Sequence, residues 1–480
     1  MHFKIIFRIL GFLLLFLGVA LITPIPFSLY YGETDWNYFV YSAIICFTLG
    51  GLSFIGLDKN DDLRPKEGFA VVTFGWITLS IFGALPFYMS GAIPNFTDAF
   101  FETISGFTTT GASILTDIES LSHGMLFWRN LINWLGGMGI IVLTIAILPF
   151  LGVGGMQLFK AESPGPTAER LKPRVTETAK LLWIVYLVYT VVITLLLWIG
   201  KMDFFDSICH AFSTIATAGF STKNTSITHF NNYYIDFVII LFMVIAGINF
   251  SLHYKLLTGD FKSFLRSSET RVFLSIIALA SIVIIFDMYF HTTYALLDII
   301  DIALFQVTAI ISTTGLGNND YELWPSISQK VILTVMFIGG TAGSTGGGIK
   351  VIRIMVLFKF VYSEIVKLLH PNAIVNIRIG DQVLDRNILL NVAGFFVLFC
   401  LIAVFGTIIM SLMGLDFLTA FTSVITTLNN VGPGFGQIGP TDNYAFISDP
   451  GKWLLSFFML VGRLELFTVL ILLAPSYWRK

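Results

Sequence analysis

Long apolar runs recur along the chain, and shorter polar connections separate them. Most of the runs reach the roughly 20 residues that an α-helix needs to cross a hydrocarbon core of about 30 Å. Residues 23–26, which follow the first run, read TPIP and lack the small-x-small pattern of a cleavage site, so this run is interpreted as a membrane helix rather than a signal peptide. The pattern predicts an all-α polytopic membrane protein with ten spans, at 5–22, 36–57, 69–89, 126–151, 181–199, 234–253, 272–290, 331–360, 388–413 and 453–473.

The positive charges predict an orientation for these spans. Most of the 28 Lys and Arg residues lie at the two termini and in alternate connections, at 58–67, 152–180, 255–271 and 350–388. Four other connections, 23–35, 92–124, 292–328 and 414–450, contain neither residue. Basic connections stay in the cytoplasm. We therefore expect both termini to be cytoplasmic, as an even number of spans requires.

Four connections on the opposite side each contain a short apolar segment that is too short to span and then breaks at a glycine. These segments are 97–116, 205–222, 301–320 and 416–436. An apolar span precedes each segment and another follows it, which indicates four repeats of span, short helix, glycine loop and span. The predicted divisions are 1–67 for two extra N-terminal spans, then repeats at 68–180, 181–271, 272–387 and 388–480. A single segment of this kind would more often be an interfacial helix, but four in register favour duplication.

The glycine loops are the candidate functional site. Non-helical backbone at membrane depth is tolerated only inside the protein or beside a water-filled cavity. Four such loops around a pseudo-fourfold axis can ring a pore with carbonyl oxygens that replace the hydration shell of a potassium ion. Glycine suits these turns because it accepts backbone conformations closed to other residues. The candidate filter residues are Thr109, Thr110, Gly111, Thr217, Ala218, Gly219, Thr313, Thr314, Gly315, Asn430, Val431 and Gly432.

Acidic residues near these loops agree with a cation as cargo, because they would gather positive ions at the mouth of the pore. The ordinary alternative is helix capping. Asp98, Asp206 and Asp416 each open a short helix, and we expect them to serve as caps there.

The eighth apolar run contains a second break. Residues 339–348 read GGTAGSTGGG, with six glycines in ten residues, and cannot form a steady helix. The break must therefore face a cavity within the membrane. A phosphate-binding loop is excluded because Lys350 follows Ile349 and precedes Val351, which does not fit G-x4-G-K-[ST].

Arg463 lies about 18 Å into the last apolar run, by the rise of a helix. A charge at that depth should face the interior and have a partner. One alternative for Arg463 is a structural ion pair, for example with Glu465.

Composition excludes several other functions. Apolar residues make up 55% of the chain and charged residues 12%, and the net charge of −2 argues against nucleic-acid binding. The seven histidines are scattered without a metal-protease or paired-acid motif, so an enzyme is not expected, nor an organic cofactor. A secondary transporter with a midplane site on broken helices is the main alternative, but that class usually has two inverted halves.

Several motifs resemble the Trk/Ktr/HKT superfamily of potassium transporters over nearly the whole chain. They are SGFTTTGAS at 105–113, ATAGFST at 216–222, STTGLGN at 312–318, NNVGPGFG at 429–436 and GGTAGSTGGGIKV at 339–351. The two extra N-terminal spans match the TrkH/TrkG type. The fourth repeat departs from the Thr-x-Gly pattern with Asn430-Val431-Gly432, a position at which the family varies.

The resemblance implies potassium uptake, with potassium as the transported substrate and with filter glycines that favour potassium over sodium. It implies that the loop 339–348 blocks the path below the filter as a gate, formed by Gly343, Ser344, Thr345, Gly346, Gly347 and Gly348 together with Arg463. It also implies a homodimer and a cytosolic TrkA-like nucleotide-binding regulatory subunit. The expected location is the inner membrane of a bacterium, since the sequon at Asn95 lies too close to a short helix for glycosylation.

Overall fold

The structure is a computed structural model that describes residues 3–54, 65–139, 175–372, 375–380 and 382–479. Within these ranges nearly all regular structure is helical. The one sheet there is an antiparallel pair of two-residue strands, β1 (Arg378–Ile379) and β2 (Gln382–Val383). The all-α class predicted from the apolar runs is confirmed.

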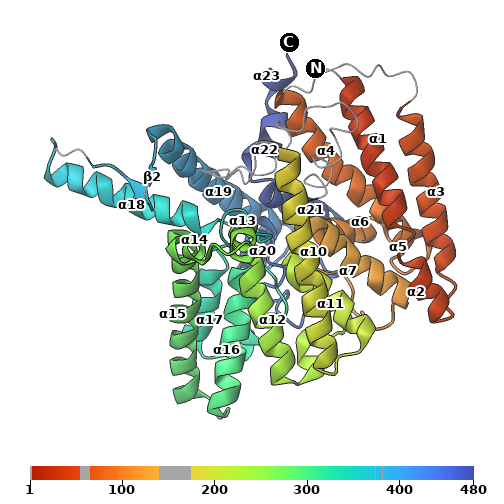
Figure 1. The fold of residues 1–480 in the computed structure, drawn as a ribbon, viewed down its shortest axis with the longest axis horizontal. Coiled ribbons are helices and arrows are strands. Elements are labelled where there is room, and N and C mark those ends of the chain that lie inside the picture. Colours follow the sequence, from red (N-terminus) through yellow and green to blue (C-terminus); the bar gives the residue numbers. More distant parts are fainter. Residues whose placement is uncertain (1–2, 55–64, 140–174, 373–374, 381, 480) are drawn as a thin grey trace.

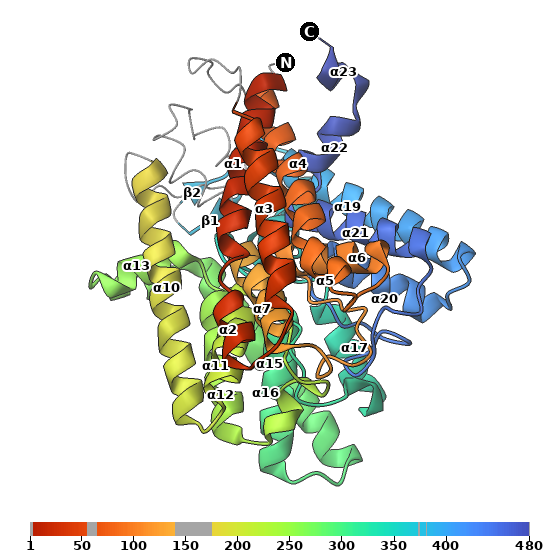
Figure 2. The same cartoon turned by 90° about the vertical axis from the view of Figure 1, so that its right-hand side faces the viewer.

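Two N-terminal helices, α1 (Phe3–Ala20) and α3 (Trp36–Leu52), pack along each other at one edge of the molecule (Figures 1 and 2). The short helix α2 (Ile25–Tyr30) connects them. Gly11 and Gly50 lie at the contact, where a Cβ added to Gly50 would stand 2.8 Å from the Gly11 carbonyl oxygen. Small residues thus let the two backbones approach closely, as is typical of membrane helices.

Four units of long helix, short helix and second helix follow, as the sequence predicted. The first unit contains α4 (Pro65–Gly83), α5 (Leu85–Met89), α6 (Phe96–Phe107) and α7 (His123–Gly137). The second unit contains α10 (Val175–Ile199), α11 (Phe204–Ala216), η2 (Ser226–Phe230), α12 (Tyr233–Ala246), α13 (Phe250–Leu257) and α14 (Phe261–Arg266).

The third unit contains α15 (Ser268–His291), α16 (Leu296–Ile311), η3 (Tyr321–Leu323), α17 (Ser326–Val335) and α18 (Val351–Leu369). The fourth unit contains α19 (Arg386–Leu412), α20 (Phe417–Leu428), α21 (Asp449–Arg463), α22 (Phe467–Leu470), η4 (Ile471–Leu473) and α23 (Pro475–Trp478).

Fewer unbroken spans occur among the described residues than the ten apolar runs suggest. Five helices are long and apolar enough to cross a membrane alone. Two sharply bent pairs, α12 with α13 at 103° and α21 with the segment Phe467–Leu473 at 112°, bring the number to seven if each pair is taken as one span. The helix α3 is shorter than its predicted run, and the predicted runs 36–57 and 126–151 end outside the described residues. The run 331–360 is split between α17 and α18 by the glycine-rich loop.

The four short helices α6, α11, α16 and α20 lie in the interior. In α6, for example, every residue from Ala99 to Phe107 is buried. Side chains cap the first turns of three of them, which satisfies backbone N–H groups that would otherwise lack partners. The caps are Asn95, Asp203 and Asp416.

Two of the three expected caps were therefore wrong. Asp98 instead pairs with Lys452, 2.6 Å away, and Asp206 accepts from Thr222 Oγ1 at 2.7 Å. In both helices the cap is the residue that precedes the first turn, while the expected aspartate lies within that turn and faces another part of the chain.

Both termini lie at the same end of the molecule (Figures 1 and 2). This agrees with an even number of crossings. At the side of the body α18 extends outward, and α19 runs back from the hairpin of β1 and β2 toward the centre (Figure 1).

Candidate functional site

The turn that follows each short helix has the same backbone conformation in all four repeats. The residue two positions before the glycine lies in the left-handed region, with φ of 54° at Thr109, 53° at Thr217, 59° at Thr313 and 53° at Asn430. Thr is β-branched and rarely adopts this conformation, so its threefold occurrence marks a constrained site. We call the turns 109–111, 217–219, 313–315 and 430–432 the glycine ring.

One hydrogen-bond pattern closes each short helix. The residue before the glycine donates its N–H to a carbonyl five positions back, from Thr110 to Ser105 at 2.8 Å and from Ala218 to Ser213 at 3.0 Å. The same bond occurs in the third and fourth repeats, at Thr314 and Val431. This is the helix-ending arrangement that requires a left-handed residue, usually Gly or Asn. The backbone itself thus fixes each turn.

The glycines bring the four turns into one closed ring of neighbours. A Cβ added to any of these glycines would overlap a carbonyl oxygen of the next repeat, and the glycines also have positive φ, so only Gly fits there. The distance from the added Cβ to that oxygen would be 2.3 Å from Gly111 to Ala218 O, 2.4 Å from Gly219 to Thr314 O, 2.1 Å from Gly315 to Val431 O, and 2.6 Å from Gly432 back to Thr110 O.

The loop 339–348 lies against this ring. Its neck is closed by Gly339 N, which donates to Ile349 O at 2.9 Å. Gly347 N donates to Thr313 Oγ1 at 2.7 Å, and Thr217 Oγ1 lies 3.3 Å from Thr345 Oγ1. Two residues of the loop therefore contact ring residues directly.

The loop also fills the bend in the second span of the second repeat. Thr341 N donates to Gly247 O at 2.9 Å, and Phe250 N donates to Gly343 O at 3.0 Å. Asn249 caps α13 and touches the site of a Cβ on Gly343. Asn249 was not among the residues predicted from the sequence, although a Gly-x-Asn stretch inside an apolar run is a signal for one helix ending and another beginning.

Arg463 bridges the loop, the ring and the first repeat. Its Nη1 donates to Thr345 O at 2.8 Å and to Thr109 Oγ1 at 2.9 Å. Its Nη2 donates to the carbonyl oxygens of Gly136 at 2.7 Å and Gly137 at 3.0 Å, at the end of α7. The guanidinium has several N–H donors in one plane, so it can bond to the loop, the ring and the end of α7 at the same time.

The ion pair considered for Arg463 has a different cation. Glu465 pairs with Arg353 of α18, whose guanidinium lies 4.0 Å from the centre of the Phe395 ring. Both Glu465 and Leu466 have positive φ, at 58° and 44°, where the last span turns sharply after Arg463. This turn was not predicted, because the sequence from 453 to 473 lacks any internal glycine after Gly462.

A second clamp on the loop comes from Glu269 at the start of α15. Its Oε1 accepts the N–H groups of Ala342 at 2.8 Å and Ile352 at 3.1 Å. One carboxylate therefore holds both the loop and the first turn of α18. This residue was not predicted, because it stands in a polar connection where acids are common.

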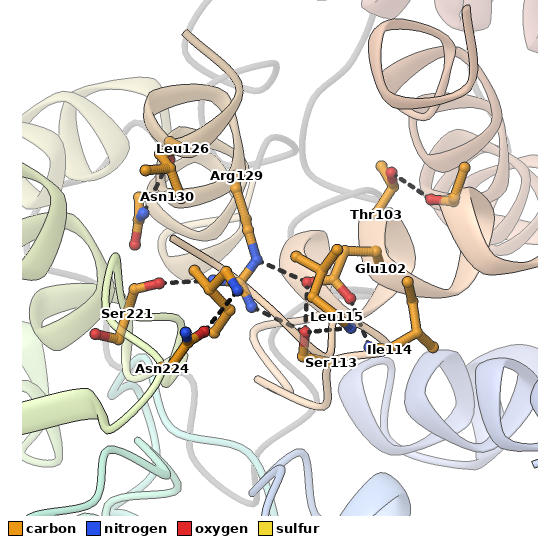
Figure 3. Close-up of polar contacts among 12 residues, drawn as sticks. Glu102, Thr103, Ser113, Ile114, Leu115, Leu126, Arg129, Asn130, Ser221 and Asn224 are labelled. Carbon is orange, nitrogen blue, oxygen red and sulfur yellow. Dashed lines mark hydrogen bonds and ion pairs between the residues drawn. The ribbon is translucent and has the colours of Figure 1, made fainter. Parts of the chain in front are cut away.

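Buried polar contacts also surround the other side of the ring. The carboxylate of Glu102 in α6 and the guanidinium of Arg129 in α7 form an ion pair at 2.7 Å (Figure 3). Tyr444 OH donates to the carbonyl of the ring residue Gly432 at 2.7 Å, and Tyr321 OH donates to Gly434 O at 2.7 Å. Arg129, Tyr321 and Tyr444 were not predicted from the sequence. Glu102 was among the acids expected to gather cations, but it lies in this buried ion pair instead.

Four short interior helices that end in one closed ring of glycine turns define a membrane protein of the pore-loop class, built from repeats of a single chain. The chain belongs to the TrkH family of cation transport proteins, whose sequence profile matches residues 37–480.

Individual relatives resemble the chain along its whole length. It is 42% identical over 486 residues to the Trk system potassium uptake protein TrkH of Escherichia coli K12, with all of both chains covered. It is 34% identical to the Trk system potassium uptake protein TrkG of the same organism, covering 100% of this chain and 99% of that one. The crystal structure of the potassium transporter TrkH from Vibrio parahaemolyticus matches with a TM-score of 0.90 at 38% identity, covering all of both chains. The resemblance inferred from the glycine motifs is thereby confirmed.

Proposed function

We propose that this protein takes up potassium ions through one pore per chain, with the glycine ring as its selectivity filter. The observation that carries the proposal is the closed ring in which each glycine meets a carbonyl of the next repeat. The relatives named as potassium uptake proteins agree with this cargo. The predicted repeat boundaries, 68–180, 181–271, 272–387 and 388–480, belong to the same proposal.

The physical basis is electrostatic. Each short helix ends at the ring with its C-terminal, negative dipole end, which favours a cation. Backbone carbonyls of Thr109, Thr110 and Gly111, and of their counterparts in the other repeats, would replace water around a dehydrated ion. The strained left-handed turns would hold those carbonyls in place before an ion arrives.

The loop 339–348 is the proposed gate, and Arg463 is proposed to hold this loop in its closed position. Contacts of Thr345 and Gly347 with ring residues support this, since a loop held there stands next to the filter. The Arg463 guanidinium adds a positive barrier to cations and ties the loop to the ring. Moving the loop would require these bonds to break.

We further propose a homodimer in the bacterial inner membrane, with both termini cytoplasmic. The basic connections support the orientation. The exposed apolar side chains of α18, among them Phe358, Tyr362 and Leu368, are consistent with burial against lipid or a second copy. A cytosolic TrkA-like nucleotide-binding subunit would act on the gate from the side of the termini, in keeping with relatives named as parts of a Trk system.

The test is rubidium uptake into liposomes that are loaded with potassium and contain the purified protein, with sodium as competitor. Wild-type protein should take up rubidium against excess sodium. Gly111→Ser adds a side chain 2.3 Å from a carbonyl oxygen and should lose that preference. Gly394→Ser is the matched control, because nothing lies within 4 Å of its Cβ position in α19.

A Gly111→Ser variant with unchanged ion preference would refute the filter assignment. Saturable flux that needs a second ion in a fixed ratio would instead indicate a coupled transporter. If wild-type flux appears only after a TrkA-like subunit is added, the gate and its regulation are supported together.

A further inference from the structure

The ion pair of Glu102 and Arg129 has no assigned role, and it is more deeply buried than any other pair with printed geometry among the described residues. The side chain of Arg129 is 1% exposed and that of Glu102 is 0% exposed. Burying two charges is costly unless additional hydrogen bonds satisfy their remaining donors and acceptors. The partners of those additional bonds therefore indicate which segments the ion pair holds in place.

The bonds lead to the segments that leave the glycine ring (Figure 3). On the first repeat, Glu102 Oε2 accepts from Ile114 N at 2.9 Å, and Ser113 Oγ donates to Glu102 Oε1 at 3.0 Å. Arg129 Nη2 donates to the same Ser113 Oγ at 3.1 Å. Ser113 stands two residues after the ring glycine Gly111.

The remaining arm of the guanidinium reaches the second repeat. Arg129 Nη1 donates to the carbonyl oxygen of Ser221 at 2.8 Å, and Ser221 stands two residues after the ring glycine Gly219. His210 Nε2 lies 2.9 Å from Ser221 Oγ and holds the same residue from α11. Arg129 also covers the face of Phe220, 3.7 Å from the ring centre. One guanidinium thus contacts the residues that follow two neighbouring ring glycines.

Other contacts link the remaining pairs of neighbouring repeats. Ile227 N donates to Gly317 O at 3.0 Å between the second and third repeats. Tyr321 OH donates to Gly434 O between the third and fourth, and Tyr444 N donates to Ser113 O at 2.8 Å between the fourth and first. Charged groups also occur there, since Glu322 Oε1 accepts from Gly436 N at 2.6 Å and Arg463 Nη1 donates to Thr109 Oγ1 at 2.9 Å. The link between the first and second repeats differs in that one guanidinium, that of Arg129, bonds to Ser113 and Ser221, each two residues after a ring glycine. We call this link the strut.

We propose that Arg129, oriented by Glu102, is a positioning residue for ion selectivity that fixes the spacing of the first and second filter turns. This inference rests on the proposed filter. Arg129 does not touch a ring carbonyl, so it would act through Ser113 and Ser221. A guanidinium with several donors in fixed geometry can hold both segments at once, whereas an ammonium group lacks this rigid geometry.

Arg129→Lys is the central variant, because it keeps the positive charge beside Glu102 and removes the fork. In the liposome assay we expect the preference for rubidium over sodium to fall roughly three- to tenfold, the equivalent of about one lost hydrogen bond. Ser113→Ala removes one acceptor of the fork and leaves the ion pair intact. It should shift the preference in the same direction by a smaller factor, and it serves as the measure if Arg129→Lys fails to fold.

Asp98→Asn is the matched control. It removes the pair of Asp98 with Lys452, one turn before Glu102 in the same helix α6. We expect it to lower the temperature at which the protein aggregates while the ion preference stays at the wild-type value. A merely structural role for Arg129 predicts that both variants change thermal stability and neither changes ion preference.

Gly111→Ser is run in parallel to separate this inference from the proposed function. If Gly111→Ser loses selectivity while Arg129→Lys and Ser113→Ala keep it, the strut is refuted and the filter stands. If Asp98→Asn loses selectivity as Arg129→Lys does, the effect is general and the strut is also refuted. If Gly111→Ser itself has no effect, the filter assignment fails first.

Discussion

The glycine ring and the adjoining layer of second spans differ in symmetry. In the ring, all four repeats share one left-handed residue, one glycine and one helix-ending hydrogen bond. In the adjoining layer each repeat is different. The helix α7 ends at Gly137, α12 and α13 meet at 103°, a glycine-rich loop separates α17 from α18, and α21 and α22 meet at 112°.

The proposed filter and gate would explain this difference. A dehydrated cation needs oxygen ligands on all sides, so every repeat must present the same backbone geometry. A path can be blocked by one segment, so a single repeat is enough to supply the loop 339–348. The other repeats then adapt to that loop, as the bend at Gly247 and the guanidinium of Arg463 do.

The largest effect should come from the ring at its tightest contact. Gly315→Ala places a methyl group 2.1 Å from Val431 O, at a φ of 71° that Ala rarely adopts. We expect rubidium uptake to fall by about a hundredfold or more, since misplacement by about 1 Å can cost that much. Uptake per folded protein in liposomes is the measurement.

Gly394→Ala is the control for that variant, because its Cβ enters open space and Ala favours helix. Uptake by Gly315→Ala at the wild-type level would mean that the ring can relax outward, and would remove the steric basis of the filter.

The next largest effect should be an increase in flux, and it should come from the adjoining layer of second spans. Arg463→Gln loses the charge-assisted bonds to Thr345 O, Gly136 O and Gly137 O. Each such bond is worth about 1.5–3 kcal/mol. Losing even one of them should shift the equilibrium of the loop from closed toward open and raise flux roughly tenfold or more. The measurement is rubidium flux without any cytosolic partner, compared with wild-type flux under the same conditions.

Arg479→Gln, in the exposed C-terminal segment, is the control and should leave flux unchanged. Reduced flux in Arg463→Gln, with unchanged protein amount, would show that the arginine supports the conducting state rather than the closed one.

These two layers were not equally accessible from the sequence. The glycine turns were predicted because a positive φ beside a carbonyl oxygen tolerates only Gly. The sequence therefore has a glycine at the same position after each of the four short helices. The broken run 339–348 was predicted because six glycines cannot form a helix in the membrane.

The contacts that hold the ring were not predictable in the same way. Glu102 and Arg129 are 27 positions apart, and neither residue differs by type from other acids or bases near the spans. The bend after Arg463 uses positive φ at Glu465 and Leu466, residues that rarely adopt it, so no sequence signal marks it. Such partners are set by tertiary packing and become visible only in the folded chain.

A smaller effect should come from a ring carbonyl that accepts a buried hydroxyl. Tyr444→Phe keeps the aromatic packing and removes the donor to Gly432 O. The released carbonyl offers its full dipole to a cation, so we expect the apparent Michaelis constant for rubidium to fall about threefold, equivalent to part of one hydrogen bond. Concentration dependence of uptake is the measurement.

Tyr477→Phe is the control. It also removes a tyrosine hydroxyl that donates to a backbone carbonyl, that of Lys66, but Tyr477 lies near the C-terminus and not in the ring. An unchanged Michaelis constant in Tyr444→Phe would indicate that Gly432 O does not face the ion path.

The smallest effect on transport should come from making the fourth turn resemble the others. Asn430 stands where the other repeats have Thr, and its Nδ2 donates to Thr110 Oγ1 and Met459 O, both at 2.9 Å. Asn430→Thr loses these bonds and puts a β-branched residue at positive φ, so the protein should aggregate at a lower temperature. Three Thr residues already hold the same backbone conformation, so carbonyl directions should persist and uptake should stay within about twofold. Loss of ion preference in this variant would mean that the Asn430 side chain, rather than the shared backbone turn, completes the ring.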